Sequence, residues 1–531
     1  MERAYRIAEV RGAEEPLLAS GEPLMEQAAY ALAQAVIRNL KRNEHTVPGS
    51  TVLVLVGAGN NGGDALFAAT YLAQRGLSVT VTTAGDAHQG GLEAVRSLGI
   101  PVITNPPLNE LRELARRAGT WIDGLLGIGA RGAMRAPLAS WVQALCDERA
   151  HSAVEPYVIA VDTPSGIGVD DGTIPGAVLP ADVTVTMGCA KPGLFLPPAR
   201  FMCGRIEQVP LGFEPYLPSK PALVQVSDAD VRDLIKVPHS SDHKYTRGVL
   251  GMLTGSRVYP GAGVLSAGGA RACGIGMIRH LSDVPDVVAA YPDVVTAPGQ
   301  VQAWLIGSGI PDVARDGASD SDEALLRKVV STFDSALEQH MPVVLDAGAI
   351  GLVYDRDVSA NVVITPHYGE LARLLQARGE AMTRADVESA PARAARLAAT
   401  LTGATVVAKG ACTVIADSSG PLFAQSGGSG WLGTAGSGDV LAGIVGALLA
   451  SNSDGFSGVG VRSFAASLAA CACHIHARAG ARAAGVPWGY GVSREGDGRG
   501  TRGGLSRVGH PITAPDIVSE LPAVFDEILN P

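Results

Sequence analysis

Residues 51–85 read TVLVLVGAGNNGGDALFAATYLAQRGLSVTVTTAG, and the order of their segments predicts the architecture of the first half of the chain. A β-branched apolar run ends in glycines, a helix-like segment (65–76) follows, and a second strand-like run (77–85) completes the pattern. This order is typical of a βαβ unit, in which both strands run parallel in one sheet with a right-handed crossover. We therefore expect an α/β domain that binds its ligand at the carboxyl ends of its strands.

The same alternation continues on both sides of this unit. Residues 24–40 carry apolar side chains at helical spacing, which predicts an amphipathic helix packed against a core. Further apolar runs at 120–127, 157–166 and 182–188 each end in a polar or glycine-rich turn, as expected of further strands.

A rise in proline density around residues 213–231 indicates a domain boundary, which we place at residue 220. A second series of strand-like and helix-like segments follows it. The sequence therefore predicts an α/β protein of two domains, 1–220 and 221–531. Residues 484–508 are rich in Gly and Arg without periodicity, so we expect a disordered surface loop, the alternative being a functional lid.

Charge and cysteine content exclude several classes of function. The net charge is -10, and no run of Lys and Arg offers a surface for nucleic acid or an anionic membrane. Seven scattered cysteines argue against a disulfide framework and favour a reducing compartment. Neither a signal peptide nor a run of about 18 apolar residues is visible. We expect a soluble cytoplasmic protein whose partners are small molecules rather than nucleic acid or membranes.

The glycine-rich turn GAGNNGGD (57–64) is the first candidate site. Its glycines let the backbone approach a ligand closely, and the next helix points free N–H groups to the same place, which suits a phosphate. An ordinary tight turn explains a glycine-rich run, but the double asparagine before GGD is much rarer. No Lys-Ser/Thr pair follows the glycines, so the turn is not a Walker-type loop.

GAGNNGGD resembles the signature of the YjeF N-terminal family, the NAD(P)H-hydrate epimerases. Three later stretches also resemble motifs of that family: DGLLGIG (123–129), DTPSG (162–166) and KPGL (191–194). The resemblance spans about residues 1–215 and implies a Rossmann-like three-layer αβα domain that epimerises hydrated NADH and NADPH. One departure is Ala65, where the family often has a third glycine, and a helix start tolerates alanine well.

This resemblance also implies how the site binds. The loop 127–133 would hold the phosphates of the hydrated cofactor, and Asn61, Asp123 and Ser165 would bind a potassium ion, since hard cations prefer oxygen ligands. The residues implied to bind the substrate, NADHX or NADPHX, are Asn60, Asn61, Gly62, Gly63, Asp64, Gly127, Ile128, Gly129, Ala130, Arg131, Gly132, Ala133 and Asp162.

Asp162 is the candidate catalytic residue of the first half. Inverting C6 of a hydrated nicotinamide requires the ring to open or the hydroxyl to exchange, and both need a general acid or base near that carbon. Lys191 is the candidate partner of Asp162. The alternative is an aspartate that only starts a turn before Pro164, and the family context favours catalysis.

The strongest feature of the second half is GTAGSGD (433–439), which precedes an apolar helix. Small residues there leave the N-terminal amides of the helix open to an anion. Asp439 stands at the helix start, where an aspartate often only caps a helix. The pattern also resembles the catalytic signature of the ribokinase-like fold, in which glycines form an anion hole and the aspartate accepts a proton from the attacking hydroxyl.

Motifs around this signature resemble the NAD(P)H-hydrate dehydratase family. They are HKYTRG (243–248), VLGMLTGS (249–256), YPGAG (259–263), GSG (307–309), LDA (345–347), TPHYGE (365–370) and KGACT (409–413). The resemblance covers roughly 225–480 and implies a ribokinase-like αβα domain. Two departures are Tyr368, where proline is usual, which alters loop rigidity, and Ser437, which replaces a common threonine but keeps the hydroxyl.

The second resemblance implies two groups of binding residues. Those facing the hydrated cofactor are Ala262, Gly309, His367, Tyr368, Gly369, Glu370, Leu371, Ala372, Arg373 and Asp439. Those holding ADP or ATP are Lys409, Gly410, Ala411, Cys412, Thr413, Ser429, Gly430, Gly436, Ser437 and Gly438.

The implied dehydration starts at Asp439, which takes the proton of the C6 hydroxyl as that oxygen attacks the terminal phosphoryl group. Phosphate then leaves and the ring regains its double bond, with Mg²⁺ neutralising the phosphates. By family analogy the nucleotide is ADP, which releases AMP and phosphate, and the protein is a homo-oligomer. The expected function is therefore repair of NAD(P)HX: epimerisation of its R and S forms, and dehydration of the S form to NAD(P)H.

Two other functions each fit part of the sequence. A small-molecule kinase of the ribokinase-like fold would share the 433–439 signature but leave the phosphate on its product. A non-catalytic N-terminal binding module would lack polar site residues, whereas this chain keeps Asn61, Asp123, Asp162 and Lys191. Both motif sets on one chain favour two activities that share one damaged cofactor.

Two histidine-containing features stay open. The run CACHIH (471–476) looks like a metal cluster, but no second ligand set lies at zinc-site spacing and an alanine-rich helix favours buried structural residues. His243 is either a ligand contact or a histidine of a surface turn.

Overall fold

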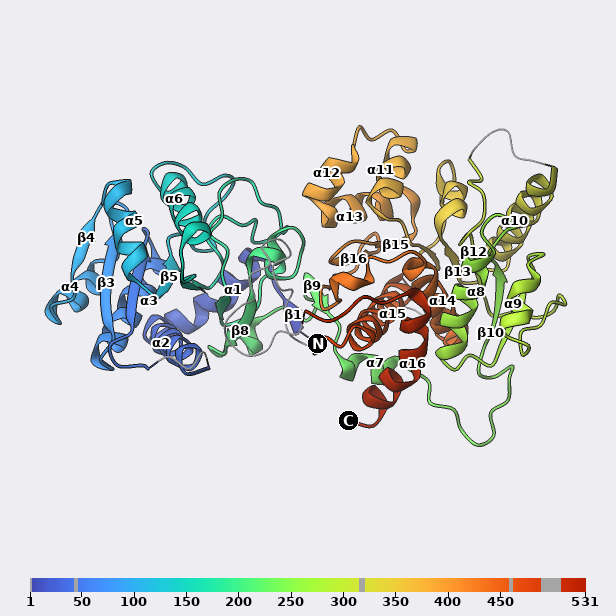
Figure 1. Ribbon diagram of the computed structural model, residues 1–531, viewed down its shortest axis with the longest axis horizontal. Coiled ribbons are helices and arrows are strands. Elements are labelled where there is room, and N and C mark those ends of the chain that lie inside the picture. The colour runs from blue at the N-terminus through green and yellow to red at the C-terminus, as the bar shows by residue number, and fades with distance from the viewer. Residues whose placement is uncertain (1, 43–45, 315–319, 458–461, 489–507) are drawn as a thin grey trace. The chain divides into compact units, whose positions relative to one another are not determined.

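The computed structural model describes residues 2–42, 46–314, 320–457, 462–488 and 508–531. These residues divide into two compact units: one comprises 3–222, the other residue 2, 223–488 and 508–531. Both units alternate helices with parallel strands (Figure 1), so the predicted α/β class is confirmed. The expected disordered loop at 484–508 falls mostly on 489–507, which lie outside the described residues.

The N-terminal unit is built on a seven-stranded sheet in the order β4-β3-β2-β5-β6-β7-β8. Its strands are β2 (Thr51–Val56), β3 (Ser78–Thr83), β4 (Val102–Thr104), β5 (Thr120–Gly124), β6 (Tyr157–Val161), β7 (Val183–Met187) and β8 (Arg205–Val209). Every neighbouring pair is parallel. The chain starts at a central strand, builds outward to one edge and then returns to build the other side, so the expected Rossmann-like domain is confirmed.

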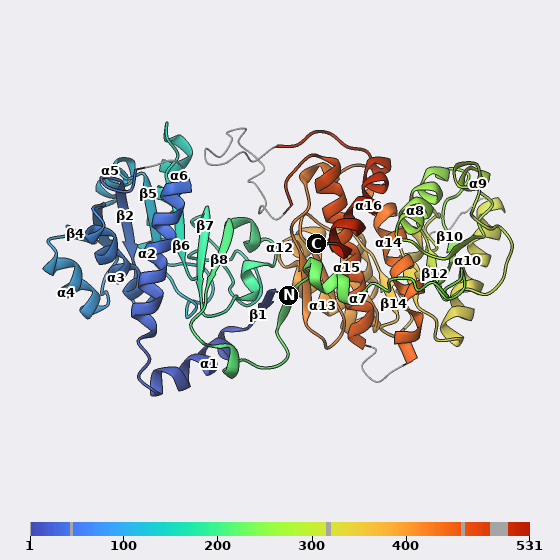
Figure 2. The same cartoon turned by 90° about the horizontal axis from the view of Figure 1, so that it is seen from below.

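Strand β2 shows why this sheet has a layer of helices on each face. Val52, Val54 and Val56 pack in one buried cluster, whereas Leu53 and Leu55 pack in another, because successive side chains of a strand point to opposite faces. The first face is covered by α2 (Leu24–Arg42) and α3 (Asn60–Gln74), and the second by α5 (Leu108–Arg117) and α6 (Leu138–His151), as Figures 1 and 2 show. The helix expected at 24–40 is α2.

Two other helices complete the N-terminal unit, α1 (Ile7–Ala19) and α4 (Gln89–Ser97). The short strand β1 (Glu2–Ala4) spans the division between the units, since residue 2 is grouped with the C-terminal unit. Short 3-10 turns are η1 (Pro192–Leu194), η2 (Ala199–Met202) and η3 (Glu214–Tyr216).

The C-terminal unit contains a mixed sheet that includes the order β9-β17-β16-β15-β14-β13-β12-β10-β11. Its strands are β9 (Leu223–Gln225), β10 (Val249–Leu253), β11 (Met277–His280), β12 (Ala303–Ile306), β13 (Val343–Leu345), β14 (Val362–Ile364), β15 (Thr405–Ala408), β16 (Thr413–Ala416) and β17 (Leu422–Gln425). The run from β11 to β15 is parallel, whereas β15, β16 and β17 form antiparallel pairs.

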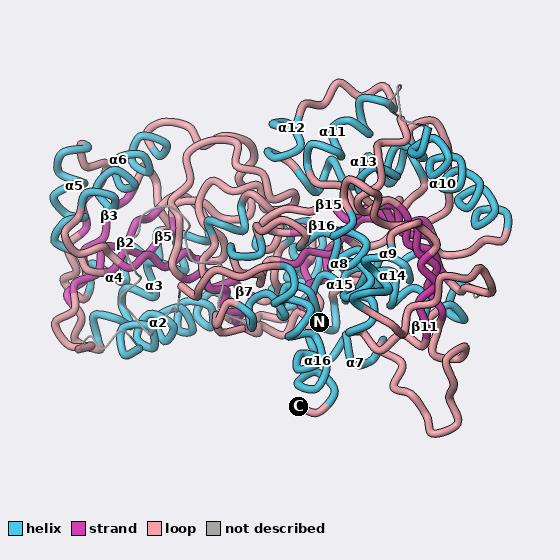
Figure 3. Tube along the Cα trace, turned by 45° about the vertical axis from the view of Figure 1, so that its right-hand side comes forward, coloured by secondary structure: helices cyan, strands magenta, loops and turns pink. Residues whose placement is uncertain are grey.

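Helices cover this sheet on both faces (Figures 1 and 3). One group is α7 (Asp228–Leu234), α8 (Pro260–Ala272), α9 (Pro285–Ala290), α14 (Ser437–Ser451), α15 (Arg462–Ala483) and α16 (Ala514–Leu529). The other is α10 (Asp320–Glu338), α11 (Tyr368–Ala377), α12 (Arg384–Ser389) and α13 (Pro391–Thr402), with 3-10 turns η4 (Ala347–Val353), η5 (Gly430–Leu432) and η6 (Ser453–Ser457) elsewhere in the unit.

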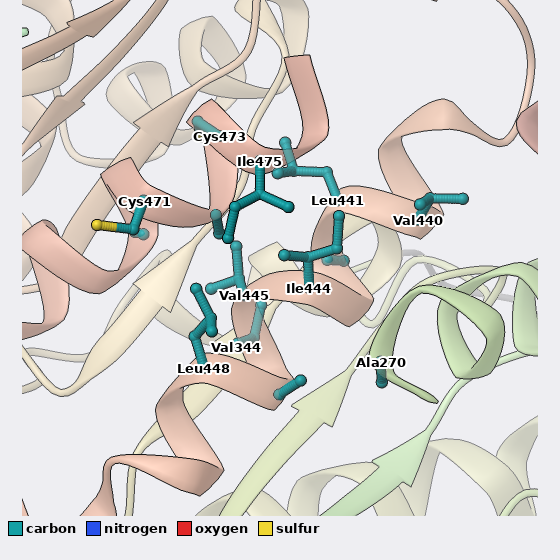
Figure 4. Packing of buried hydrophobic residues seen from close by; sticks show 14 of the residues in the cluster. Ala270, Val344, Val440, Leu441, Ile444, Val445, Leu448, Cys471, Cys473 and Ile475 are labelled. Carbon is teal, nitrogen blue, oxygen red and sulfur yellow. The ribbon is translucent and has the colours of Figure 1, made fainter. Parts of the chain in front are cut away.

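The core of the C-terminal unit lies where α14 and α15 pack together. Figure 4 shows Leu441 and Val445 of α14 near Cys471 and Ile475 of α15, all of them buried. Such packing explains the long apolar and alanine-rich runs, since both helices have neighbours on most sides. Over the described ranges, no helix is both long and apolar enough to cross a membrane.

Candidate active sites

A cavity of about 400 Å³ opens at the carboxyl ends of the strands in the N-terminal unit. Predicted residues that line it are Asn60, Asn61, Asp64, Gly127, Ile128, Gly129, Ala130, Asp162 and Lys191. The rest of the predicted loop, Arg131, Gly132 and Ala133, is exposed and does not line the cavity. Gly62 and Gly63 are buried in the first turn of α3 behind it.

The glycine-rich turn between β2 and α3 is shaped by close backbone contacts. A Cβ atom on Gly57 would lie 1.8 Å from the carbonyl oxygen of Leu125, so any side chain there would displace the neighbouring strand end. Gly59 has a φ of 96°, a conformation that side-chain-bearing residues rarely adopt. The turn therefore brings the N-terminus of α3 to the cavity, where its free N–H groups suit an anion.

The three predicted potassium ligands gather around the backbone of Leu126. Asn61 Nδ2 donates to the carbonyl oxygens of Leu126 and Val161, each at 3.0 Å. Ser165 Oγ lies 2.6 Å from Asp123 Oδ1 and accepts from Leu126 N–H at 2.9 Å.

Asp123 is a fully buried carboxyl group, and burial raises its pKa. Its hydrogen bonds come from Ser165 and the backbone, and no lysine or arginine pairs with it among the described residues. A buried carboxylate surrounded by hydroxyl, amide and carbonyl oxygens is a donor set that fits a monovalent cation.

Asp162 and Lys191 form a buried ion pair at the cavity wall. Lys191 Nζ contacts Asp162 Oδ1 and also donates to the Met187 carbonyl oxygen at 2.9 Å. The same carboxylate oxygen accepts from Met187 N–H at 2.9 Å and Thr186 Oγ1 at 3.2 Å. Lys191 is only 1% exposed, so the charges are held in place by the protein rather than by water.

The backbone at Asp162 is strained. Its φ is 64°, in the left-handed region, directly after the last residue of β6. Such a conformation in a residue other than glycine costs about 1–3 kcal/mol and is concentrated at functional sites. The strained backbone places Asp162 at the cavity wall, where a catalytic residue is expected to lie.

Two further carboxyl groups line the same cavity. Burial raises the pKa of Asp64 well above its usual value, and the nearby charges of Asp162 and Glu14 add to the effect. Burial followed by the charge of Asp162 also raises the pKa of Glu14, on α1. Sequence reasoning did not single out Glu14 because it lies far along the chain from every recognised motif.

In the C-terminal unit, Asp439 lies in the first turn of α14. Gly436 directly precedes this helix and has a φ of 85°, in the left-handed region. Burial raises the pKa of Asp439 to about 7, with a further increase from Asp346 and a decrease from Lys409. A carboxyl group with this pKa exchanges its proton near neutral pH, which is the property a general base requires.

Lys409 and Asp346 form a second buried ion pair beneath this helix start. Lys409 Nζ donates to Asp346 Oδ1 at 2.8 Å and lies 3.4 Å from the position of a Cβ on Gly438. Asp346 also accepts from Thr365 Oγ1 at 2.6 Å and Ser308 Oγ at 2.8 Å. Residues from β12, β13, β14 and β15 ends thus meet at the N-terminus of α14.

The residues predicted to face the hydrated cofactor fall into two groups, one around Ala262 and Gly309 and one at the start of α11. Ala262 and Gly309 are adjacent, since a Cβ on Gly309 would lie 2.5 Å from that of Ala262. His367 caps α11, its Nδ1 accepting from Gly369 N–H at 3.0 Å. The remaining members follow in α11: Tyr368, Glu370 and the exposed Arg373 at its start, with Leu371 and Ala372 buried on its inner face.

The predicted nucleotide-binding residues occupy three segments. Lys409 to Cys412 form the turn between β15 and β16, and Thr413 begins β16. The hydroxyl of Tyr368 packs against Gly410, where a Cβ would meet it at 2.2 Å, so the substrate-facing and nucleotide-facing loops touch. Ser429 caps η5, which contains Gly430, and Gly436 to Gly438 start α14.

Ser437 has a partner that the sequence did not reveal. Its Oγ lies 3.2 Å from Nε2 of His476, a buried residue of α15. Burial lowers the pKa of His476 to about 4, so the ring is neutral at physiological pH. The neighbouring Cys471 and Cys473 are buried in the core, and His474 contacts Asp228 at 2.8 Å.

His243 is exposed and its Nδ1 accepts backbone N–H groups of its own turn. That turn precedes β10 and so lies near the start of this strand. The ligand-facing loops follow the other end of the strand, after Leu253. The structure therefore favours the turn histidine over the ligand contact.

The comparisons agree with both halves of this description. Residues 21–193 match the family model for the YjeF-related protein N-terminus, and residues 250–493 match that for NAD(P)H-hydrate dehydratase. The chain is 38% identical to the bifunctional NAD(P)H-hydrate repair enzyme Nnr of Mycobacterium leprae (strain TN), over 92% of this chain and 95% of that protein. The corresponding Corynebacterium glutamicum protein is 30% identical over 85% of this chain and 88% of its own length.

A separate relative matches the first half alone. The NAD(P)H-hydrate epimerase of Clavibacter michiganensis subsp. michiganensis is 43% identical over 40% of this chain and 90% of its own length. With two matched domains in one order and full-length relatives, this chain belongs to the family of bifunctional NAD(P)H-hydrate repair enzymes.

Proposed function

We propose that the N-terminal cavity epimerises NADHX and NADPHX, and that the site at the start of α14 dehydrates the S form with ADP. The observation that supports this assignment is the pairing of each glycine-rich helix N-terminus with an aspartate suited to proton transfer. Asp162 forms a buried ion pair with Lys191, and Asp439 has a pKa of about 7. Each proposed site thus combines a helix N-terminus suited to an anion with a proton acceptor.

In the epimerase site, the start of α3 and the loop 127–130 would hold the phosphates and Asp162 would exchange a proton at C6. A potassium ion held by Asn61, Asp123 and Ser165 would supply the positive charge that the buried Asp123 lacks. That charge would fix the turn after β5, which forms one wall of the cavity.

In the dehydratase site, Asp439 would accept the proton of the C6 hydroxyl as that oxygen attacks the terminal phosphoryl group. Ser437 and Gly438 would offer backbone N–H groups to the phosphate, and Lys409 would supply a nearby positive charge. Mg²⁺ bound with the nucleotide would neutralise the remaining phosphate charge. The proposed products are NAD(P)H, AMP and orthophosphate.

We further propose that the enzyme acts in the cytoplasm, as a homo-oligomer, on small molecules alone. The acidic charge without a Lys/Arg run supports small-molecule partners, and seven cysteines that form no disulfide in the described part of the chain support a reducing compartment.

One experiment tests both activities together. The enzyme is given a mixture of the R and S forms of NADHX with ADP and Mg²⁺, and both the absorbance of restored NADH and the orthophosphate are followed. We expect NADH to return from the whole mixture, with one orthophosphate released per NADH. A phosphorylated product that accumulates without orthophosphate would instead identify a kinase.

A further inference from the structure

Helix α1 forms a wall of the epimerase cavity that none of the recognised motifs contains. Its side chains Val10, Arg11, Glu14 and Leu18 line the cavity together with Asp162 and Lys191. The matched N-terminal family model begins at residue 21, after α1 has ended. The role of this helix must therefore be derived from its own contacts.

The start of α1 is tied to both loops that carry the ion pair. Tyr5 N–H donates to the carbonyl oxygen of Ala190 at 2.9 Å, and Ala4 pairs with Ala190 as a parallel bridge, one residue before Lys191. Ile7 N–H donates to Asp170 Oδ1 at 2.8 Å, in the loop that follows Asp162. These backbone contacts fix α1 relative to the catalytic pair, so Glu14 has a defined place in the cavity.

The charges around Glu14 determine where protons reside. Asp162 faces it as a like charge, whereas Lys191 and Arg11 oppose that effect, and burial disfavours the charged form. Burial, Asp162 and Glu14 itself disfavour the charged form of Asp64, and Lys191 opposes them. Three carboxyl groups in one cavity with a single buried ion pair cannot all ionise easily, so the cavity favours keeping one of them protonated beside an ionised one.

Inverting C6 of NAD(P)HX needs both of those forms. One group must protonate the hydroxyl that leaves, and another must take a proton from the water that adds to the other face of the ring. Asp162, which forms an ion pair with Lys191, provides the proton acceptor. A separate proton donor is still needed.

We propose that Glu14 is a second catalytic acid–base residue of the epimerase site, acting from α1 while Asp162 acts from the end of β6. The assignment rests on the epimerase function proposed above. Protonated Glu14 gives its proton to the C6 hydroxyl, the C6–O bond breaks with its electron pair leaving on water, and the N1 lone pair forms an N1=C6 double bond.

Water then adds to the opposite face of C6. A new C6–O bond forms, the electrons of the double bond return to N1, and the proton released goes to Asp162. Exchange with solvent restores the starting protonation states, and the reverse reaction uses the two residues in exchanged roles. No oxidant or further reactant is needed.

The test compares Glu14→Gln with Glu15→Gln in the full-length enzyme. Glu15 is the exposed neighbour on the same helix and does not line the cavity, so it is a matched control. Interconversion of purified epimers is followed by chromatography across pH, without nucleotide. We expect kcat of Glu14→Gln to fall about 100-fold or more, with KM within about threefold, while Glu15→Gln matches the unaltered enzyme.

Two more readouts separate catalysis from a structural role. The rate of the unaltered enzyme should fall as pH rises and Glu14 loses its proton, and this alkaline decline should be absent in Glu14→Gln. Added formate should restore part of the activity of Glu14→Ala, because a small acid can occupy the vacated space.

Each outcome bears on one assignment. A kcat of Glu14→Gln within about threefold of that of the unaltered enzyme would overturn the role of Glu14. Equal losses of kcat in Glu14→Gln and Glu15→Gln would overturn it as well. An unaltered enzyme that does not interconvert the epimers would overturn the epimerase function itself, which is a distinct failure. Dehydratase activity of the same preparations should be unchanged and normalises the enzyme concentration, and circular dichroism shows whether the N-terminal unit of each variant is folded.

Discussion

Lys409 donates a 2.8 Å hydrogen bond to Asp346, a buried carboxylate. The pair lies beneath the first turn of α14, the helix that begins at Ser437. This pair sets the charge that Asp439 experiences, since Asp346 raises the pKa of Asp439 and Lys409 lowers it. The arrangement leaves Asp439 able to exchange a proton near neutral pH while Asp346 remains ionised.

Dehydration should therefore depend on pH through Asp439. The base must be ionised, so kcat should rise with pH through about 7 and level off above it, falling about tenfold per pH unit on the acid side. Lys409→Met removes the cation that lowers the pKa and should move this rise to higher pH. The measurement is kcat against pH at saturating ADP. An unchanged midpoint in Lys409→Met would contradict the assignment.

Breaking the ion pair in the first domain should affect stability as well as activity. Lys191→Met leaves the Asp162 carboxylate buried without its cation, which should lower the free energy of unfolding by about 3–5 kcal/mol. Adding Asp162→Asn should recover most of that loss without restoring epimerisation. Chemical denaturation followed by circular dichroism measures both variants. Equal stability of the single and double variants would show that the two charges do not interact.

Epimerisation should depend on potassium, whereas dehydration of the purified S form should be far less sensitive. Choline chloride matched to potassium chloride in ionic strength should slow epimerisation, because the charge of Asp123 is then unbalanced. Ser165→Ala removes a predicted ligand and a hydrogen bond of 2.6 Å to Asp123, so it should reduce the potassium response. A rate that is the same in both salts would exclude the ion.

His476 should make the enzyme less stable in acid. Burial lowers its pKa from about 6.5 to about 4 in the folded state, so the unfolded state binds the proton first. Stability present above pH 6.5 is therefore lost as the pH falls toward 4, by up to about 3 kcal/mol from this residue. His476→Gln should reduce the acid-dependent loss of unfolding free energy by that amount. His151→Gln, at an exposed position, should leave the loss unchanged. Unfolding curves at several pH values decide between these outcomes.

The candidate sites could be predicted where their chemistry is contiguous in the chain. Gly57 to Asp64 and Gly433 to Asp439 are turns whose geometry depends on neighbouring residues, so their residue types indicated candidate anion sites, and the resemblance of the surrounding motifs indicated the function. The parallel pairing of β2 with β3 followed from the βαβ pattern of residues 51–85.

What the sequence did not reveal depends on contacts between distant residues. Lys409 and Asp346 are far apart in the chain and meet only because their strand ends converge. Glu14 reaches the cavity because β1 pairs beside Ala190, and His476 reaches Ser437 because α15 packs on α14. Conversely, Arg131 to Ala133 belong to the loop predicted to hold the phosphates but lie exposed beyond the cavity lining.

If two independent sites repair one substrate, variants that each lack one site should complement each other. A mixture of NADHX epimers with ADP and Mg²⁺ is given to Asp162→Asn, to Asp439→Asn and to both proteins together, and NADH is followed. Asp162→Asn should restore the S fraction quickly and the remainder only at the uncatalysed rate, Asp439→Asn should restore almost none, and the two together should restore all of it. Rapid return of NADH with Asp439→Asn alone, or of both epimers with Asp162→Asn alone, would contradict the account.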